Sequence, residues 1–304
     1  MDVYLPIANL AINGLWIVLL GAATGILSGL FGVGGGFLTT PLLIFSGIPP
    51  TVSAASAATQ VTGASVSGVI AHGKNDGVDY QIGLVIVAGG MLGALLGAGL
   101  FNLLRSIGQI DTVINVLYVI LLGTIGSLML KEALQTMGVV SKDGNKRAAK
   151  RRHHPWIAAL PYRMRFYRSG LYISPIAPLV LGIVTGILTM LMGVGGGFIM
   201  VPAMLYILGM SAKVVVGTSL FNILFITMLV TMVHAFTTQA VDIVLAGLLL
   251  IGSVIGAQLG TRIAQFAKPE QLRLALAVVV LVIALNMLWG LTIRPDEVYT
   301  VVPL

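Results

Sequence analysis

The chain has 304 residues, of which 57% are apolar and only 9% are charged, and its mean hydropathy is +1.02. A water-soluble domain of this length needs more charge to cover its surface, so the composition excludes an ordinary soluble protein. Cysteine is absent, which excludes a disulfide framework and a cysteine-based metal site. At about 20 apolar residues per span, the length predicts an all-α integral membrane protein with about eight helical segments.

The expected segments fall into two groups of four on either side of one polar connection. Apolar stretches cover residues 13–48, 50–72, 80–104, 110–131, 174–208, 212–236, 240–266 and 268–291. We therefore divide the chain into an N-terminal transmembrane unit (1–131), a linker (132–173), a C-terminal transmembrane unit (174–291) and a tail (292–304).

The net charge of +7 comes mainly from the linker, because ten of the 17 Lys and Arg residues lie between Lys131 and Arg168. Basic loops stay on the inner side of a membrane, so this pattern predicts a cytoplasmic linker in a multi-pass protein of the inner (plasma) membrane. Residues 142–168 are also suited to contact anionic lipid. The linker contains no recognisable binding module, so its charge does not indicate nucleic acid as a partner.

The two transmembrane units have the same sequence pattern. The run GILSGLFGVGGGFLTTP from Gly25 to Pro41 matches GILTMLMGVGGGFIMVP from Gly186 to Pro202. The separation of matched positions rises only from 161 residues at Gly25 to 163 at Gly97, which matches Gly260. A register held this far predicts a tandem repeat of one four-segment unit. The matched polar residues are Ser56 with Thr218, Gln60 with Asn222, His72 with His234, and Asp79 with Asp242.

The first segment of each unit is too long to be a single span. As one helix, residues 13–48 would measure about 54 Å, against a hydrocarbon core of about 30 Å. The glycines of the GVGGG run in its middle favour a broken, re-entrant helix that leaves the membrane on the side it entered. Each unit then crosses three times, so the second repeat is inverted, and most basic loop residues fall on the cytoplasmic side.

The doubled GVGGG run is the first candidate site. A break at membrane depth must lie within protein or beside a cavity, and the helix that follows it offers unpaired N–H groups and a positive dipole end to an anion. The alternative is that glycines only let helices pack closely, as we expect for the ladders at Gly21/Gly25/Gly29, Gly89/Gly93/Gly97 and Gly252/Gly256/Gly260. The candidate anion-binding glycines are Gly32, Gly34, Gly35, Gly36, Gly193, Gly195, Gly196 and Gly197.

A polar stripe on the next helix of each unit is the second candidate site. Ser56 and Gln60 are four residues apart and share a helix face, and Thr218 and Asn222 repeat this pair. A buried carboxamide must face the bundle or a cavity, where it binds an oxyanion or makes hydrogen bonds between helices. Both interpretations remain open.

Four further residues recur in matched positions. His72 and His234 are candidates for proton coupling, or they are solvated residues at the membrane interface. Asp79 and Asp242 open their helices and are predicted to be N-caps, with gating as a secondary role. We find no Asp, Glu, Lys or Arg in the middle of a predicted span, which argues against a carboxylate-driven cation pump. No catalytic triad or metal cluster is apparent, so we expect neither enzyme activity nor a cofactor.

At these residues the chain resembles a known family. The repeated GVGGGF-x-x-x-P and the VGTS-x-FN stretch from Val216 to Asn222 are similar to the sulfite exporter TauE/SafE family, also called the toluene sulfonate uptake permease superfamily. The resemblance implies transport of sulfite, sulfonates such as sulfoacetate, or related organic anions across the bacterial inner membrane. The first unit departs from the second, with Ala55-Ser-Ala-Ala-Thr-Gln60 where the second has Gly217-Thr-Ser-Leu-Phe-Asn222.

The residues and the resemblance together predict a secondary transporter that moves small anions by alternating access. Its expected partners are the anionic substrate and the lipid bilayer, and the sequence leaves a homo-oligomer open. The alternatives from other classes are a non-transporting assembly or sensory component that uses the basic linker, and an anion channel.

Overall fold

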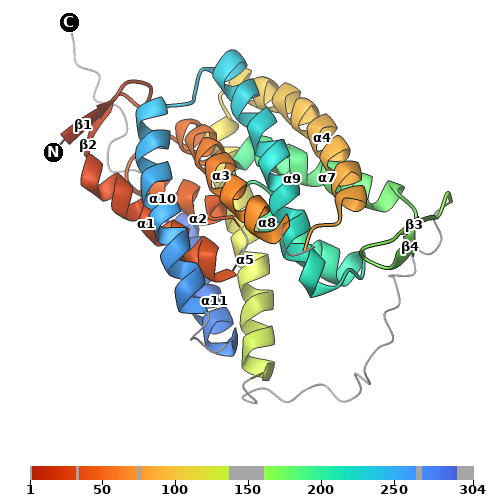
Figure 1. Ribbon diagram of the computed structural model, residues 1–304. Coiled ribbons are helices and arrows are strands. Elements are labelled where there is room, and N and C mark those ends of the chain that lie inside the picture. Colours follow the sequence, from red (N-terminus) through yellow and green to blue (C-terminus); the bar gives the residue numbers. More distant parts are fainter. Residues whose placement is uncertain (1, 32–33, 74–76, 137–160, 265–268, 293–304) are drawn as a thin grey trace, which may run out of the picture.

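The computed structural model describes residues 2–31, 34–73, 77–136, 161–264 and 269–292. Most of the predicted linker, nearly all of the predicted tail, and Gly32 and Val33 lie outside the described residues. The described residues form one bundle of helices with a short β-hairpin at each of two opposite sides (Figure 1).

The N-terminal part of the chain contains a hairpin and five helices. These are β1 (Asp2–Leu5), β2 (Leu10–Asn13), α1 (Gly14–Phe31), α2 (Gly36–Phe45), α3 (Pro50–Gly73), α4 (Tyr80–Ser106) and α5 (Ile110–Thr136). The strands pair antiparallel with Val3 opposite Ile12. Helix α5 therefore extends five residues into the predicted linker.

The C-terminal part begins with a second hairpin, which the sequence analysis did not predict. Its elements are β3 (Met164–Phe166), β4 (Leu171–Ile173), α7 (Ile176–Met192), α8 (Gly197–Pro202), the π-helix η1 (Ala203–Ile207), α9 (Ala212–Val233), the π-helix η2 (His234–Thr238), α10 (Ile243–Ala264) and α11 (Pro269–Thr292). The hairpin pairs Arg165 with Tyr172. The hairpin lies inside the predicted linker, so the C-terminal end of the linker forms regular secondary structure.

Five helical segments in the described part of the chain are long and apolar enough to cross a membrane: Tyr80–Ser106, Ile110–Gln135, Val214–Thr238, Ile243–Gly260 and Leu274–Thr292. Shorter apolar helices occur at Gly14–Leu30, Gly36–Phe45, Ile176–Met192 and Gly197–Ile207. The structure therefore supports the predicted all-α, multi-pass membrane protein. Helix α3 has the length of a span but is rich in Ser and Thr, and it lies in the interior of the bundle.

Glycines let two pairs of helices pack with their backbones in contact. A Cβ added at Gly252 or Gly256 of α10 would overlap the carbonyl oxygen of Val18 or Ala22 in α1. Helices α4 and α7 pair in the same way through Gly89 with Leu179, Gly93 with Ile183 and Gly97 with Ile187. These contacts confirm the predicted packing role of the glycine ladders in α4 and α10. Residue numbers rise together in both partners, so each pair is parallel.

Helices α3 and α9 cross at the centre in opposite directions. The Thr62 hydroxyl donates to Thr227 Oγ1 at 2.8 Å, and the Thr59 hydroxyl donates to Thr231 Oγ1 at 3.4 Å. Since residue numbers rise in α3 as they fall in α9, the two helices are antiparallel. The Thr59, Thr62 and Thr227 hydroxyls also bond to carbonyl oxygens of their own helices.

The segment that contains each glycine run begins and ends on the same side of the bundle. The Trp16 indole N–H, near the start of α1, donates to the Ser46 hydroxyl just after α2 at 3.4 Å. In the other half, Ile176 at the start of α7 and Ile207 at the end of η1 line one pocket of about 440 Å³. This pocket is lined by apolar residues, so it does not suit an anion: Ile176, Ala177, Val180, Leu181, Val184, Ile199, Ala203, Ile207 and Leu208.

Alanine substitution tests the backbone contact between α4 and α7. We expect Gly93→Ala to destabilise the protein by about 2 kcal/mol, because its Cβ would overlap the Ile183 carbonyl group. Gly99→Ala in the same helix is the matched control, because its Cβ would meet nothing within 4 Å and alanine favours a helix. Thermal unfolding in detergent measures both variants. Equal midpoints would show that this contact is not tightly packed.

Candidate functional site

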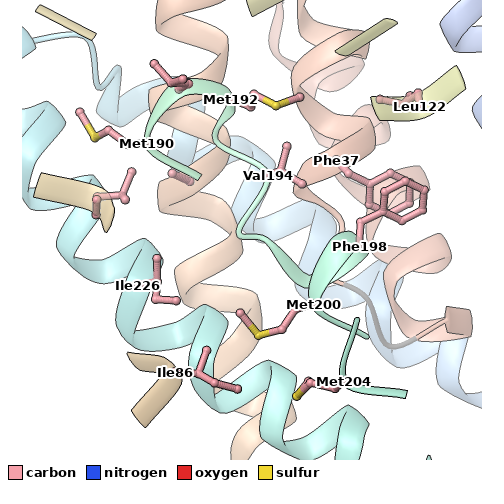
Figure 2. Close-up of a cluster of buried hydrophobic side chains, with 14 of the residues drawn as sticks. Phe37, Ile86, Leu122, Met190, Met192, Val194, Phe198, Met200, Met204 and Ile226 are labelled. Atoms are coloured by element: carbon pink, nitrogen blue, oxygen red, sulfur yellow. The ribbon is translucent and has the colours of Figure 1, made fainter. Parts of the chain in front are cut away.

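The glycine run of the C-terminal half interrupts the helix. Helix α7 ends at Met192, and Gly193, Gly195 and Gly196 have φ values of 71°, 74° and 72°. Residues with a side chain rarely adopt this left-handed region, so the run requires glycine. A Cβ at Gly193 would also overlap the Ala54 carbonyl group. The chain crosses the break without helical turns before helix α8 begins at Gly197 (Figure 2).

Side chains from three other elements hold the free carbonyl groups at the end of α7. The Tyr118 hydroxyl of α5 donates to the Met192 carbonyl oxygen at 2.7 Å, and the Thr40 hydroxyl of α2 donates to the same oxygen at 3.2 Å. His234 Nε2 lies 3.0 Å from the Met190 carbonyl oxygen. A helix end leaves such carbonyls without partners, so these donors replace the bonds that the break removes.

The two glycine runs meet at the centre of the bundle. A Cβ added at Gly34 would lie 3.5 Å from Ile223 and 3.8 Å from Val61, and one added at Gly195 would lie 3.0 Å and 2.8 Å from the same two side chains. Val61 and Ile223 occupy matched positions on α3 and α9. The runs are therefore brought together, except for Gly32, which lies outside the described residues.

Two aromatic rings close this centre. Phe37 and Phe198 follow the two glycine runs, and their rings stack with centroids 4.3 Å apart and an interplanar angle of 6° (Figure 2). Gly36 lies at the same place, because its added Cβ would approach the Gly193 carbonyl oxygen to 3.0 Å. Two further candidate glycines pack on the first helices of their own halves, Gly35 on Thr24 and Gly196 on Thr185, and Gly197 is the first residue of α8.

Gln60 and Asn222 face the protein interior, as predicted. They are 1% and 0% exposed, and Asn222 Nδ2 donates to the Met200 sulfur at 3.4 Å. The structure shows no hydrogen-bond partner for Gln60 Oε1 or Asn222 Oδ1. A buried polar atom without a partner is costly, so these positions are suited to a bound group. Rotating a carboxamide exchanges its oxygen and its NH₂ group, so each can offer either an acceptor or two donors.

The hydrogen bonds of Ser56 and Thr218 go to aspartates of the opposite half of the chain and not to the glycine runs. The Thr218 hydroxyl accepts a bond from the Asp79 backbone N–H at 2.9 Å, and the Ser56 hydroxyl accepts one from the Asp242 N–H at 3.2 Å. Each residue thus joins its helix to the other half of the chain. The prediction that both aspartates are N-caps is confirmed, because their Oδ1 atoms accept backbone N–H groups in the first turns of α4 and α10.

His234 is buried, so the interface interpretation is wrong for this residue. Its ring lies against Phe101 at 5.1 Å between centroids, and Nδ1 lies 3.0 Å from the Thr238 hydroxyl. A carbonyl oxygen only accepts, so the Nε2–H group donates to the Met190 carbonyl oxygen. If the ring is neutral, Nδ1 then has no hydrogen and can only accept. The side chain of His72 lies outside the described residues. Proton coupling at either histidine stays a prediction.

Sequence reasoning missed two residues of this centre, Tyr118 and Thr40. Tyr118 lies among apolar neighbours, Thr40 directly follows Thr39, and Val201 occupies the position that matches Thr40. A hydroxyl at only one of two matched positions was the available signal. Among the described residues, no three His, Asp or Glu side chains gather in a way that would hold a metal ion.

The fold and the centre define a multi-pass membrane transporter with interrupted helices. A family comparison agrees: residues 17–287 match the model of the sulfite exporter TauE/SafE family. The chain belongs to this family.

Curated relatives have matching descriptions. The chain is 25% identical over 272 residues to the probable membrane transporter protein YjnA of Bacillus subtilis, covering 90% of this chain and 98% of the relative. It is 27% identical over 281 residues to YunE of the same organism, a probable membrane transporter protein, covering 90% and 96%. A sulfite exporter TauE/SafE family protein of Arabidopsis thaliana is 36% identical over 76 residues, which cover 24% of this chain and 17% of the relative. No solved structure matches the chain.

The Tyr118 and Thr40 hydroxyls both donate to the Met192 carbonyl oxygen, so each should partly compensate for the loss of the other. Tyr118→Phe or Thr40→Val alone removes one of two donors, so we expect each to lower the free energy of unfolding by about 1 kcal/mol. The double variant leaves a carbonyl unpaired and should cost more than the two single losses added together. Thermal unfolding in detergent measures this cycle, with the exposed Tyr172→Phe as the control. Strictly additive losses would show that the two bonds are independent.

Proposed function

We propose that the protein is a secondary transporter that moves small anions, sulfite or related organosulfonates, by alternating access. The observation that carries the proposal is the meeting of the two glycine breaks on Val61 and Ile223. Interrupted helices at corresponding positions of two halves are typical of transporter binding sites.

The proposal includes two inverted four-segment repeats, each beginning with a re-entrant hairpin. Contacts between helices support the inversion. Gly83 and Gly90 of α4 face Phe221 and Ile226 of α9 in rising order, so α4 and α9 are parallel. The Ser56 bond to Asp242 and the contact of Gly63 with Leu250 make α3 and α10 parallel in the same way. Because α3 opposes α9, each of these helices runs opposite to its match, α3 to α9 and α4 to α10.

Helix dipoles supply the attraction for an anion in this proposal. Helix α2 begins at Gly36, and the apolar helical segment Gly197–Ile207 begins at the matched position. The first N–H groups of a helix have no partner within it, and together they carry a partial positive charge. No buried Lys or Arg is then needed, which avoids the cost of placing a cation in the bilayer.

Gln60 and Asn222 complete the proposed site as neutral groups. Their amide NH₂ groups can donate to an oxyanion, and their lack of formal charge favours release as well as binding. The stacked Phe37 and Phe198 rings close the centre, so this conformation matches an occluded state, and the cycle requires the rings to part.

The substrate class is supported by the family name and by the Arabidopsis relative, both of which refer to sulfite export. Radiolabelled sulfite flux into proteoliposomes tests it, with sulfoacetate, sulfate and chloride as competitors. We expect saturable uptake and counterflow of sulfite. Linear, non-saturating flux would favour an anion channel, and no uptake of labelled sulfite or of labelled sulfoacetate would contradict the proposal.

The basic linker provides the test of the non-transporting alternative. Deleting residues 142–158 leaves the β3–β4 hairpin in place, because that hairpin begins at Met164. A carrier should keep its sulfite flux without this segment, whereas a docking protein has no flux to lose. The cytoplasmic position of the linker, its contact with anionic lipid and a homo-oligomeric state stay predictions.

The two buried carboxamides give a direct functional prediction. We expect Gln60→Leu and Asn222→Leu each to lower sulfite flux about tenfold, because a charge-assisted hydrogen bond is worth roughly this factor. The thermal midpoint should hold or rise, since each change removes a buried oxygen that has no partner. Asn102→Leu, an exposed carboxamide on α4, is the control and should keep its flux. Parallel losses of flux and stability would indicate a structural role instead.

A further inference from the structure

We propose that Asp79 and Asp242 are the latches of two gates, each of which holds a β-hairpin of the opposite half against one end of the bundle. This inference rests on the proposed alternating-access function. Its basis is a set of hydrogen bonds that recurs at two matched positions although the participating hairpins have different sequences.

The first latch joins Asp79 to the β3–β4 hairpin. Asp79 Oδ2 accepts the Ser169 backbone N–H at 2.9 Å and the Ser169 hydroxyl at 2.7 Å. Next to it, Arg168 donates to the Val78 carbonyl oxygen at 3.0 Å, and its guanidinium lies 5.6 Å from the centre of the Tyr80 ring. Asp79 and Ser169 are 1% and 5% exposed, so the contact closes over buried groups.

The second latch joins Asp242 to the β1–β2 hairpin. Asp242 Oδ2 accepts the backbone N–H of Ile7 at 3.0 Å, and Asp242 is 1% exposed. Leu5 of the same hairpin is fully buried and packs in a cluster with Leu245 and Leu249 of α10. Each hairpin is therefore fixed to the start of a helix that belongs to the other repeat.

Each latch is connected to a helix that carries a candidate binding residue. The Asp79 backbone N–H donates to Thr218, which lies one turn before Asn222 on α9. The Asp242 N–H donates to Ser56, one turn before Gln60 on α3. A movement of α3 or α9 that accompanies substrate binding would therefore pull on the aspartate and on the hairpin it holds. This coupling accounts for the same hydrogen-bond geometry at the Asp79–Thr218 and Asp242–Ser56 pairs, which packing alone does not require.

The two latches lie at opposite ends of the bundle. Ser56 and Thr218 each lie near the start of their helix, and α3 and α9 are antiparallel. The hairpins accordingly lie on opposite sides of the molecule (Figure 1). Alternating access requires one gate on each side of the site, opened in turn. Both latches are formed here, as expected for an occluded state.

A carboxylate is the side chain that this arrangement needs. Oδ1 of each aspartate caps its own helix while Oδ2 accepts from the hairpin, so both oxygens serve as acceptors. An asparagine keeps the shape but has only one oxygen, and its NH₂ group would face a donor at one of the two positions. Asp→Asn should therefore weaken the latch or the cap without changing the packing volume.

The absence of native cysteine allows a test that does not depend on the substrate. Thr62→Cys places one thiol at the centre of the bundle, next to Thr227. A charged, membrane-impermeant methanethiosulfonate is added to one face or the other of oriented proteoliposomes, and the rate of labelling is measured. We expect Asp79→Asn to speed labelling from one face and Asp242→Asn to speed it from the other. Each increase should be about tenfold, since a lost hydrogen bond to a charged group shifts an equilibrium by roughly this factor.

Two further variants make the result decisive. Ser169→Ala removes a latch bond and leaves the α4 cap intact, so it should speed labelling from the same face as Asp79→Asn even if the latter variant folds poorly. Ser127→Ala, which removes an exposed hydroxyl that donates to the Thr124 carbonyl oxygen within α5, is the control and should label like the parent. Unchanged rates, or faster labelling from both faces in every latch variant, would overturn the latch proposal. If labelling becomes faster from one face only but no sulfite flux is measured, the latch proposal stands and the proposed substrate is rejected.

Discussion

The structure depends on how the chain satisfies the backbone groups that a broken helix leaves free. Inside a bilayer no water is present to bond them, so a break needs partners from the protein. At the end of α7 these partners are hydroxyls of Tyr118 and Thr40 and the ring of His234, which come from three separate elements. The break is therefore a feature of the whole assembled bundle. It is held by tertiary contacts that a local sequence window does not contain.

This dependence explains which features could be predicted from the sequence. The helices, the glycine ladders and the interior position of Gln60 and Asn222 follow from hydropathy, spacing and the cost of burying an amide. The two hairpins were missed because strands of three or four residues have no detectable period. The burial of His234 was missed because its partner is a backbone carbonyl 44 residues away, which no side-chain pattern reveals. The specific bonds of Ser56 and Thr218 could not be predicted either, because their partners are backbone N–H groups of the opposite half of the chain.

The two halves share a pattern but differ in the side chains that close it. Thr40 bonds to the opposite break, whereas Val201 at the matched position has no hydroxyl to donate. The Trp16 indole of α1 donates a hydrogen bond to Ser46, whereas Ala177 at the matched position lines the apolar pocket. An inverted pair that is chemically identical would have the same energy facing either way. In the proposed alternating-access cycle, differences of this kind would give the inward-facing and outward-facing states different energies and therefore different populations.

The parallel pairing of α1 with α10 and of α4 with α7 has a consequence for biosynthesis. The backbone face that Gly21 and Gly25 expose on α1 meets its partner only when Leu249 and Ser253 of α10 have been synthesised. Until then the packing faces of α1 and α4 have no partner, so we expect that neither half folds stably without the other. A gene divided at the linker would have to supply both fragments to the same membrane at the same time, because each completes the other.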